Sequence, residues 1–366
     1  MTTRLNAGIS INNPADLVAA VPPMLGFAPT NSLVLLTIHD LPDTPRFGTT
    51  MRVDLPCPGQ RSQLAAHLLA GPLRTHRPDA VVMVVVGDQT NRERCAVECP
   101  GSEVCQDTVD VDGSPPHREL VDVVGDSFAF AGIATLHALW APEIRAGADW
   151  ACYSSPDCCG KIPDPKLSTI AAALTAAGVV TFGSKDELRE LVAPESDEAL
   201  ARRSARIDAL TDELDEACGP DRTSHDLKAV FSAIRRTAEG AALTEDDLLR
   251  VMIAVSDTRV RDVALGAALG ESSDAAEQLW LTLVRKAPAP ELADVASLLA
   301  FSAYLRGDGG LAGVALERVE KTRPEHRLGM LLRQALEAGI PPSDLSVIAR
   351  DAAEDARLMI EEDGAW

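Results

Sequence analysis

The stretch AVVMVVV, Ala80–Val86, contains the longest uninterrupted apolar run of the sequence. A run without alternation is typical of a strand that is covered on both faces. Further strand candidates are Ser32–Ile38, Phe47–Leu55, Ala138–Glu143, Asp149–Tyr153 and Val179–Phe182. Helix candidates alternate with them, at Pro14–Val21, Gln60–Leu69, Arg118–Leu139 and Leu167–Ala177. The first half therefore predicts an α/β domain with a mixed or parallel sheet between helices.

The second half of the chain has only helix candidates. They are Ser196–Ala217, Ser224–Ala238, Thr244–Ala254, Asp274–Arg285, Pro290–Leu305, Gly309–Lys321, Pro324–Ala338 and Pro342–Ile360. Their short breaks favour stacked antiparallel pairs. Ala312, Leu316, Val319 and Pro324 have the offsets of the second helix of a tetratricopeptide repeat. We expect an α/β, cysteine-bearing sensor domain over residues 1–194. Residues 195–366 should form an all-α helical-hairpin domain, for which a tetratricopeptide-like (TPR-like) solenoid is one alternative.

Composition excludes several functional classes. The chain has 366 residues, a formal net charge of −21 and 4% aromatic residues. Such a charge repels phosphate backbones and anionic lipid, and aromatic platforms for single-stranded nucleic acid are scarce. No apolar run reaches the length of about 18 residues that a membrane span needs, and the N-terminus lacks a signal core. We expect a cytoplasmic protein whose partners are proteins or small ligands.

Cysteines are the most informative residues of the sequence. All eight lie at or before Cys218: Cys57, Cys95, Cys99, Cys105, Cys152, Cys158, Cys159 and Cys218. Clustered cysteines in a reducing cytosol indicate redox or metal chemistry more often than permanent disulfides. We therefore expect sensing to belong to the first half.

The first cluster predicts an intramolecular disulfide between Cys95 and Cys105. A disulfide needs Cα atoms about 4.4–6.8 Å apart, and Pro100-Gly101 supplies a turn that could bring the two together. Arginines beside Cys95, at positions 92 and 94, favour its thiolate, so Cys95 is the expected nucleophile and Cys105 the resolving thiol. Cys99 lies between them. It could be an alternative resolving thiol, or it could be buried or take no part in the reaction.

Three other interpretations of the cysteines stay open. The first cluster could be inert, could bind zinc with His117 as a fourth ligand, or could bind an iron–sulfur cluster, since its spacing is near C-x2-C-x5-C. In the second cluster, Cys152 could bridge to Cys158 or to Cys159. The simpler expectation is that these cysteines stay reduced and pack as small apolar side chains where a strand meets a loop. We predict no resident metal.

The sequence contains no catalytic signature. The glycine pattern at 307–312 fits G-x-G-x-x-A, but a helix candidate precedes it, where a dinucleotide fingerprint requires a strand. We therefore expect neither an enzyme nor a cofactor. The alternatives are a ligand-binding or enzymatic α/β protein with incidental cysteines, and a zinc-stabilised scaffold.

Short motifs in a fixed order resemble an actinobacterial family, the domain-of-unknown-function family numbered 4192. They are Asn13–Leu17, Pro22–Phe27, Asn31–Val34, Arg52–Pro56, Trp150–Cys159, Ser184–Leu188 and Leu305–Gly309. The C-x9-C pair further resembles that of an oxidative-stress regulator in this family. The resemblance implies a redox sensor with Cys95 and Cys105 as the sensing pair. The remaining clustered cysteines, Cys99, Cys152, Cys158 and Cys159, are candidate additional thiols. The resemblance also implies an extracytoplasmic-function sigma factor as partner. The acidic charge favours only indirect contact with DNA and argues against a membrane partner, and a homodimer stays open.

Overall fold

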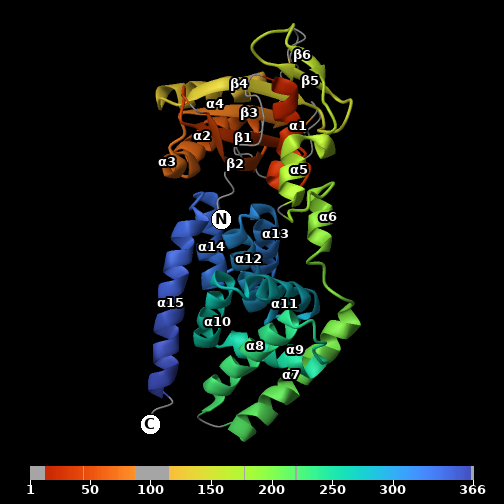
Figure 1. Ribbon diagram of the computed structural model, residues 1–366, viewed down its shortest axis with the longest axis vertical. Coiled ribbons are helices and arrows are strands. Elements are labelled where there is room, and N and C mark those ends of the chain that lie inside the picture. Colours follow the sequence, from red (N-terminus) through yellow and green to blue (C-terminus); the bar gives the residue numbers. More distant parts are fainter. Residues whose placement is uncertain (1–12, 44, 88–114, 177, 219–220, 364–366) are drawn as a thin grey trace. The chain divides into compact units, whose positions relative to one another are not determined.

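The protein divides into two compact units, with the division between Lys185 and Asp186 (Figure 1). The computed structural model describes residues 13–43, 45–87, 115–176, 178–218 and 221–363. The sequence analysis placed the boundary between residues 194 and 195. Within the helical unit, Arg189 of helix α6 (Lys185–Glu190) forms an ion pair with Glu317, with Nε 2.9 Å from Oε2, and this contact ties α6 to that unit.

The α/β unit contains a six-stranded mixed sheet in the part of the chain that is described, with the order β2-β1-β3-β4-β5-β6. The strands are β1 Ser32–His39, β2 Arg46–Asp54, β3 Ala80–Val86, β4 Ala134–Ala141, β5 Asp149–Cys152 and β6 Cys159–Lys161. Only β3 and β4 pair in parallel among these neighbours. The predicted mixed sheet with flanking helices is confirmed.

Strand β3 lies inside the sheet between β1 and β4, and all seven of its residues are buried. Its even-numbered residues pack in one apolar cluster with Leu17 of helix α1, and its odd-numbered residues pack in a second cluster with Leu68 of α2 and Phe128 of α4. Helices therefore cover both faces of the sheet, which is why this strand is apolar at every position.

The helices of the α/β unit follow the prediction with two corrections. They are α1 Pro14–Leu25, α2 Arg61–Ala70, α3 Pro72–His76, α4 Arg118–Phe130 and α5 Thr169–Ala176, with 3₁₀ turns η1 Pro58–Gln60 and η2 Pro165–Leu167. The expected end of α1 before Pro22 is wrong. The helix continues through both prolines and ends at Gly26, whose positive φ of 82° suits glycine and whose amide donates to the Pro22 carbonyl.

The expected helix Arg118–Leu139 is wrong in its second half. Helix α4 ends at Phe130, and β4 begins at Ala134. Gly132 has a φ of 79°, and the amide of Ile133 donates to the Phe128 carbonyl at 2.9 Å, so the chain turns within three residues. The expected strand Val179–Phe182 is reduced to one bridge in the described chain, between Phe182 and Phe27.

The second unit is built of packed helices, as predicted. They are α7 Asp197–Cys218, α8 Arg222–Ala238, α9 Glu245–Ser256, α10 Thr258–Leu265, α11 Ser273–Lys286, α12 Leu292–Arg306, α13 Gly309–Thr322, α14 Arg327–Glu337 and α15 Pro342–Asp363, with the 3₁₀ turn η4 Gly266–Leu269. Sequence analysis missed α10, which Asp257 starts by accepting a hydrogen bond from the Arg259 amide. The tetratricopeptide likeness stays a prediction.

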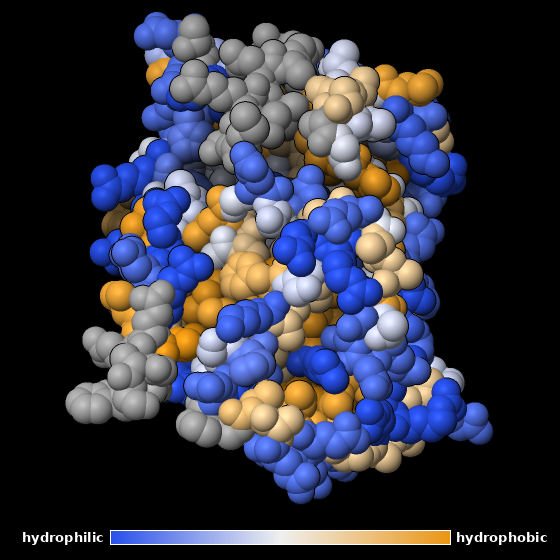
Figure 2. Space-filling view, turned by 60° about the horizontal axis from the view of Figure 1, so that its bottom comes forward, coloured by the Kyte–Doolittle hydropathy of each residue, from blue (hydrophilic) through white to orange (hydrophobic). Residues whose placement is uncertain are grey.

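The outer surface agrees with the acidic composition. Figure 2 shows a face covered mostly by hydrophilic residues, with apolar residues visible in the hollows between them. Among the described residues, no helix is both long enough and apolar enough to cross a membrane.

Candidate redox site

The second cysteine cluster lies on a β-hairpin at one edge of the sheet. Strands β5 and β6 pair antiparallel, with Ala151 opposite Cys159, and β5 also pairs with β4. The amide of Cys152 donates to the carbonyl of Cys158 at 2.7 Å, which closes the turn between the strands. The Cα atoms of Cys152 and Cys158 lie 5.3 Å apart, and their sulfur atoms form a disulfide.

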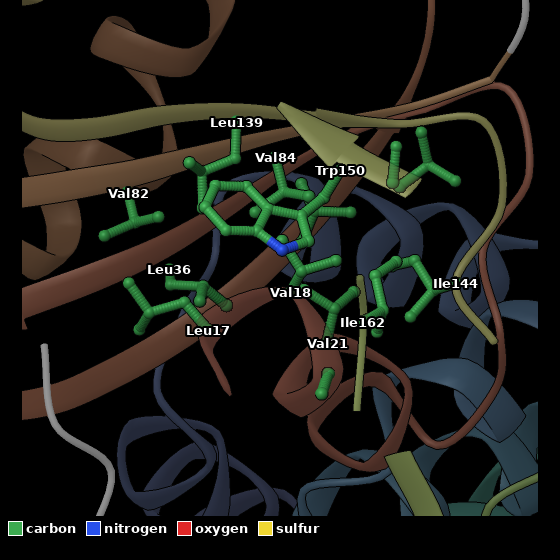
Figure 3. Close-up of a cluster of buried hydrophobic side chains, with 14 of the residues drawn as sticks. Leu17, Val18, Val21, Leu36, Val82, Val84, Leu139, Ile144, Trp150 and Ile162 are labelled. Atoms are coloured by element: carbon green, nitrogen blue, oxygen red, sulfur yellow. The ribbon is translucent and has the colours of Figure 1, made fainter. Parts of the chain in front are cut away.

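The disulfide is set against the apolar core rather than in solvent. Cys152 is buried and Cys158 is partly buried against the same cluster, which also contains Trp150 (Figure 3). The Trp150 ring covers Gly160 on the facing strand, where an added Cβ would lie 3.1 Å from the indole Nε1. Packing therefore fixes the hairpin, and a glycine at position 160 makes room for the ring.

Tyr153 connects the disulfide to the start of helix α4. The Tyr153 amide donates to the Ala138 carbonyl of β4 at 3.0 Å, and its buried hydroxyl donates to the Pro116 carbonyl at 2.5 Å. Arg118 donates from Nη2 to the Tyr153 carbonyl at 2.6 Å and lies over the ring at 5.9 Å from its centroid. Residues 116–118 are thus fixed directly beside Cys152.

The end of β3 is fixed to the same strand, β4. The Gly87 amide donates to the Ala141 carbonyl at 3.0 Å, and the Trp140 indole donates to the Gly87 carbonyl at 2.8 Å. Trp140 pairs in turn with Ala151, next to Cys152. Of the two described ends that flank residues 88–114, Gly87 is therefore bonded directly to β4, whereas Pro116 is bonded to Tyr153, whose amide donates to Ala138 of β4.

The cysteines proposed from sequence are placed as follows. Cys95, Cys99 and Cys105 lie outside the described residues, so the structure does not test their pairing. The second cluster, expected to consist of packed thiols, contains the Cys152–Cys158 bridge rather than Cys152–Cys159. Cys159 is a free, exposed cysteine, and Cys57 and Cys218 are half-buried.

The zinc alternative gains no support from the described residues. Within the described chain, no group of three or more His, Cys, Asp or Glu side chains is arranged to hold a metal ion. His117, the fourth ligand of that alternative, precedes α4 with a φ of 64°. Its three expected cysteine partners lie outside the described residues.

The arrangement can perform thiol–disulfide chemistry. The Cys152–Cys158 bond accepts two electrons and two protons to give two thiols. The adjacent Cys159 thiol lies at the surface, where its thiolate can attack a disulfide and displace one of its sulfurs as a thiolate. Sequence analysis missed Tyr153 and Arg118, which join this bond to α4. Their signal was the direct adjacency of Tyr153 to Cys152.

The fold and this site define a class of protein, an α/β domain with a cysteine hairpin at the sheet edge followed by an all-helical unit. The chain belongs to the family described as "Domain of unknown function (DUF4192)", whose model matches residues 14–343. No curated protein and no solved structure matches the chain.

Proposed function

We propose that this protein is a cytoplasmic thiol-based redox sensor that regulates oxidative-stress transcription through an extracytoplasmic-function sigma factor. An intramolecular Cys95–Cys105 disulfide is the switch, in line with the resemblance to the oxidative-stress regulator AosR. One observation supports this most. Gly87 and Pro116 flank the segment that carries the two cysteines. Gly87 is held by Trp140 of β4, and Pro116 is held by Tyr153, which directly follows Cys152 of the disulfide.

The sensing reaction balances with peroxide as the oxidant. The Cys95 thiolate attacks a peroxide oxygen, which leaves a sulfenic acid on Cys95 and releases hydroxide. The Cys105 thiol then attacks that sulfur and releases water, so that a disulfide forms. The switch reverts when a cellular dithiol reduces the bond by two electrons.

The helical unit supplies the partner surface in this proposal. Its exposed acids include Asp212, Glu213, Asp215 and Glu216 near the end of α7. Such groups suit the basic DNA-binding regions of a sigma factor, and charge complementarity chiefly raises the association rate and the selectivity. The sigma factor, rather than this acidic chain, then contacts the promoter.

Peptide mapping tests the switch. Mild peroxide should produce a linked Cys95–Cys105 peptide in the full chain, and dithiothreitol should remove it. The Cys57→Ser variant is the matched control, since Cys57 lies outside both clusters, and it should give the same linked peptide. Finding Cys95 and Cys105 both alkylated after oxidation would overturn the proposal, and one zinc per reduced chain would favour the zinc-stabilised scaffold.

Affinity for the sigma factor tests the coupling. Wild type and the Cys95→Ser/Cys105→Ser double variant are each measured oxidised and reduced. Oxidised wild type should differ from the other three samples by about tenfold, which corresponds to about 1.4 kcal/mol. Equal affinity in all four samples would remove the switch from the mechanism.

A further inference from the structure

The helical unit contains a cavity that the thiol chemistry does not use. It has a volume of about 620 Å³ and is lined by residues of α9, α10, α12, α14 and α15 and of the segment before α14. Small-molecule sites typically occupy about 300–1,000 Å³ and combine apolar walls with a few converging polar groups. The cavity lies within this range of volume, and its lining combines an apolar wall with a group of charged side chains.

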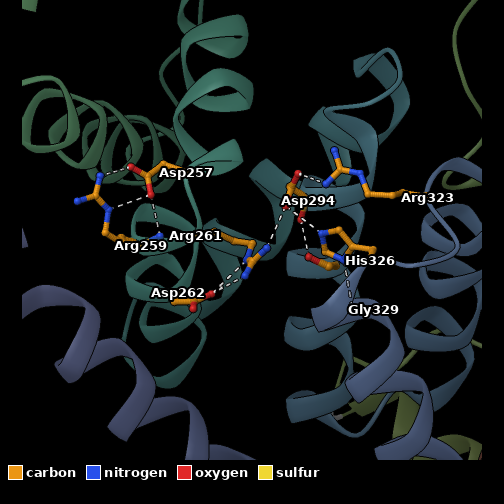
Figure 4. Close-up of polar contacts among 9 residues, drawn as sticks. Asp257, Arg259, Arg261, Asp262, Asp294, Arg323, His326 and Gly329 are labelled. Atoms are coloured by element: carbon orange, nitrogen blue, oxygen red, sulfur yellow. Dashed lines mark hydrogen bonds and ion pairs between the residues drawn. The ribbon is translucent and has the colours of Figure 1, made fainter. Parts of the chain in front are cut away.

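A buried ionic cluster forms the polar end (Figure 4). The Asp294 carboxylate, 2% exposed, accepts from His326 Nε2 at 2.9 Å and from Arg261 Nη1 at 3.1 Å. His326 Nδ1 accepts from the Gly329 amide at 3.1 Å, so the ring is held on both sides. Arg261 also holds Asp262 at 2.9 Å. These side chains therefore form hydrogen bonds with one another, and they hold the polar end of the cavity in a fixed arrangement.

Two guanidinium groups of the lining keep donors available. Arg323 makes one long hydrogen bond, to Asp294 Oδ2 at 3.4 Å, and Arg327 makes no hydrogen bond or ion pair within the described residues. The carboxylate of Glu325, which lies between these two arginines in the sequence, likewise has no partner among the described residues and also lines the cavity. The charged groups of the whole lining balance, because three arginines (Arg261, Arg323 and Arg327) face three acids (Asp262, Asp294 and Glu325). A bound anion would therefore be held by the unused donors of Arg323 and Arg327 and not by an excess of positive charge.

The opposite wall is apolar. This apolar part of the lining is formed by Leu265 of α10, Phe301 of α12, Leu332 of α14 and Leu345 of α15. Ile348 of α15 lies at the rim and is 62% exposed. An alkyl or aromatic body would cover this surface and remove it from water, at about 25 cal/mol per Å² of apolar area.

We propose that this cavity binds an amphipathic monocarboxylate, with its carboxylate on Arg323 and Arg327 and its apolar body against the wall from Phe301 to Ile348. Charged donors on a carboxylate give strong hydrogen bonds, and guanidinium groups match its two oxygens. The inference does not depend on the proposed redox function, because none of its residues is a cysteine.

Calorimetric titration of the full chain with decanoate, below its micellar concentration, tests the site. Decanoate should bind at one site, and 1-decanol and decyltrimethylammonium should bind at least about tenfold more weakly, because neither offers an anion to the two arginines. Arg323→Gln and Arg327→Gln should each weaken decanoate binding several-fold, whereas Arg350→Gln, on the exposed surface of α15 and outside the lining, should not.

A second pair of variants tests the apolar wall. Ile348→Asp should abolish binding, because it places a carboxylate at the rim, and Val347→Asp should leave binding unchanged. Val347 is the matched control because it is 52% exposed on the same helix and does not line the cavity. Absence of decanoate binding, equal binding of decanol, or equal effects of the two aspartate variants would each overturn the proposal.

Discussion

At the scale of single residues, the Asp294 carboxylate decides the stability of the helical core. Asp294→Ala removes the acceptor of His326 Nε2 and of Arg261 Nη1, both buried, so we expect a loss of about 3 kcal/mol in the free energy of unfolding. Urea unfolding followed by circular dichroism measures this loss. Asp351→Ala, at an exposed position of α15, is the control and should change little. Similar unfolding midpoints for the two variants would contradict this account.

The same carboxylate predicts a dependence on pH. Burial acts to raise the pKa of Asp294, but the hydrogen bond from His326 and the charge of Arg261 outweigh it and hold the pKa below its ordinary value. The stabilisation is therefore complete above the unfolded pKa of about 4 and is lost as the pH falls through the lower folded value. The stability difference between wild type and Asp294→Ala should narrow only in that acidic range, as urea unfolding at stepwise lower pH would measure.

Tyr304 gives the opposite dependence. Burial raises the pKa of its hydroxyl to about 12, and the single proton of the hydroxyl is shared between the carbonyls of Ala335 and Ile340, both 2.8 Å from the oxygen. Because the folded pKa exceeds the unfolded value of about 10, the stabilisation is complete below pH 10 and is lost as the pH rises through 12. Tyr304→Phe should cost about 1 kcal/mol at neutral pH and lose this alkaline slope in urea unfolding. Parallel curves for the two proteins between pH 9 and 12 would refute it.

At the scale of elements, the β5–β6 hairpin depends on Gly160. Gly160→Ala brings a Cβ to 3.1 Å from Trp150 Nε1, so we expect a cost of about 1–2 kcal/mol and faster reduction of Cys152–Cys158 by dithiothreitol. Mass spectrometry after alkylation measures the reduction rate. Gly59→Ala is the matched control, since no atom lies within 4 Å of its added Cβ. Equal rates of disulfide reduction in the two variants would show that packing of Trp150 on Gly160 does not stabilise the hairpin.

Local sequence patterns predicted an element correctly where the pattern of apolar residues matches the burial of that element in the fold. The run Ala80–Val86 is apolar because both sheet faces are covered, so its pattern identified it directly. The end of α4 could not be placed, because apolar residues continue from Phe128 through Leu139 and the turn depends on the backbone of Gly132 alone.

The candidate sites were predictable only in part, because they depend on contacts distant in sequence. The second cysteine cluster was visible, but the choice of Cys158 over Cys159 follows from the register of β5 on β6. Asp294 was not singled out from sequence, although it is a lone acid in an apolar helix, and its partner His326 lies two helices further along the chain.

At the scale of the whole molecule, the net charge of −21 disfavours direct contact with nucleic acid. The isolated chain should show no specific duplex binding in the nanomolar range at physiological salt, because it would bring negative charge against phosphates instead of releasing counterions. Fluorescence anisotropy with a labelled duplex measures this, with and without the sigma factor. Nanomolar binding by the chain alone would contradict both this prediction and the indirect route to the promoter.

The parallel pairing of β3 with β4 also has a consequence for synthesis on the ribosome. Strands β1 and β2 are joined by a short connection and can pair as soon as both emerge. Strand β3 must wait for residues 87–133 to be made before β4 can cover its second edge, and such non-local pairing is slow. The nascent chain therefore presents the AVVMVVV edge unpaired during translation, and this segment is where we expect chaperones to bind and aggregation to begin.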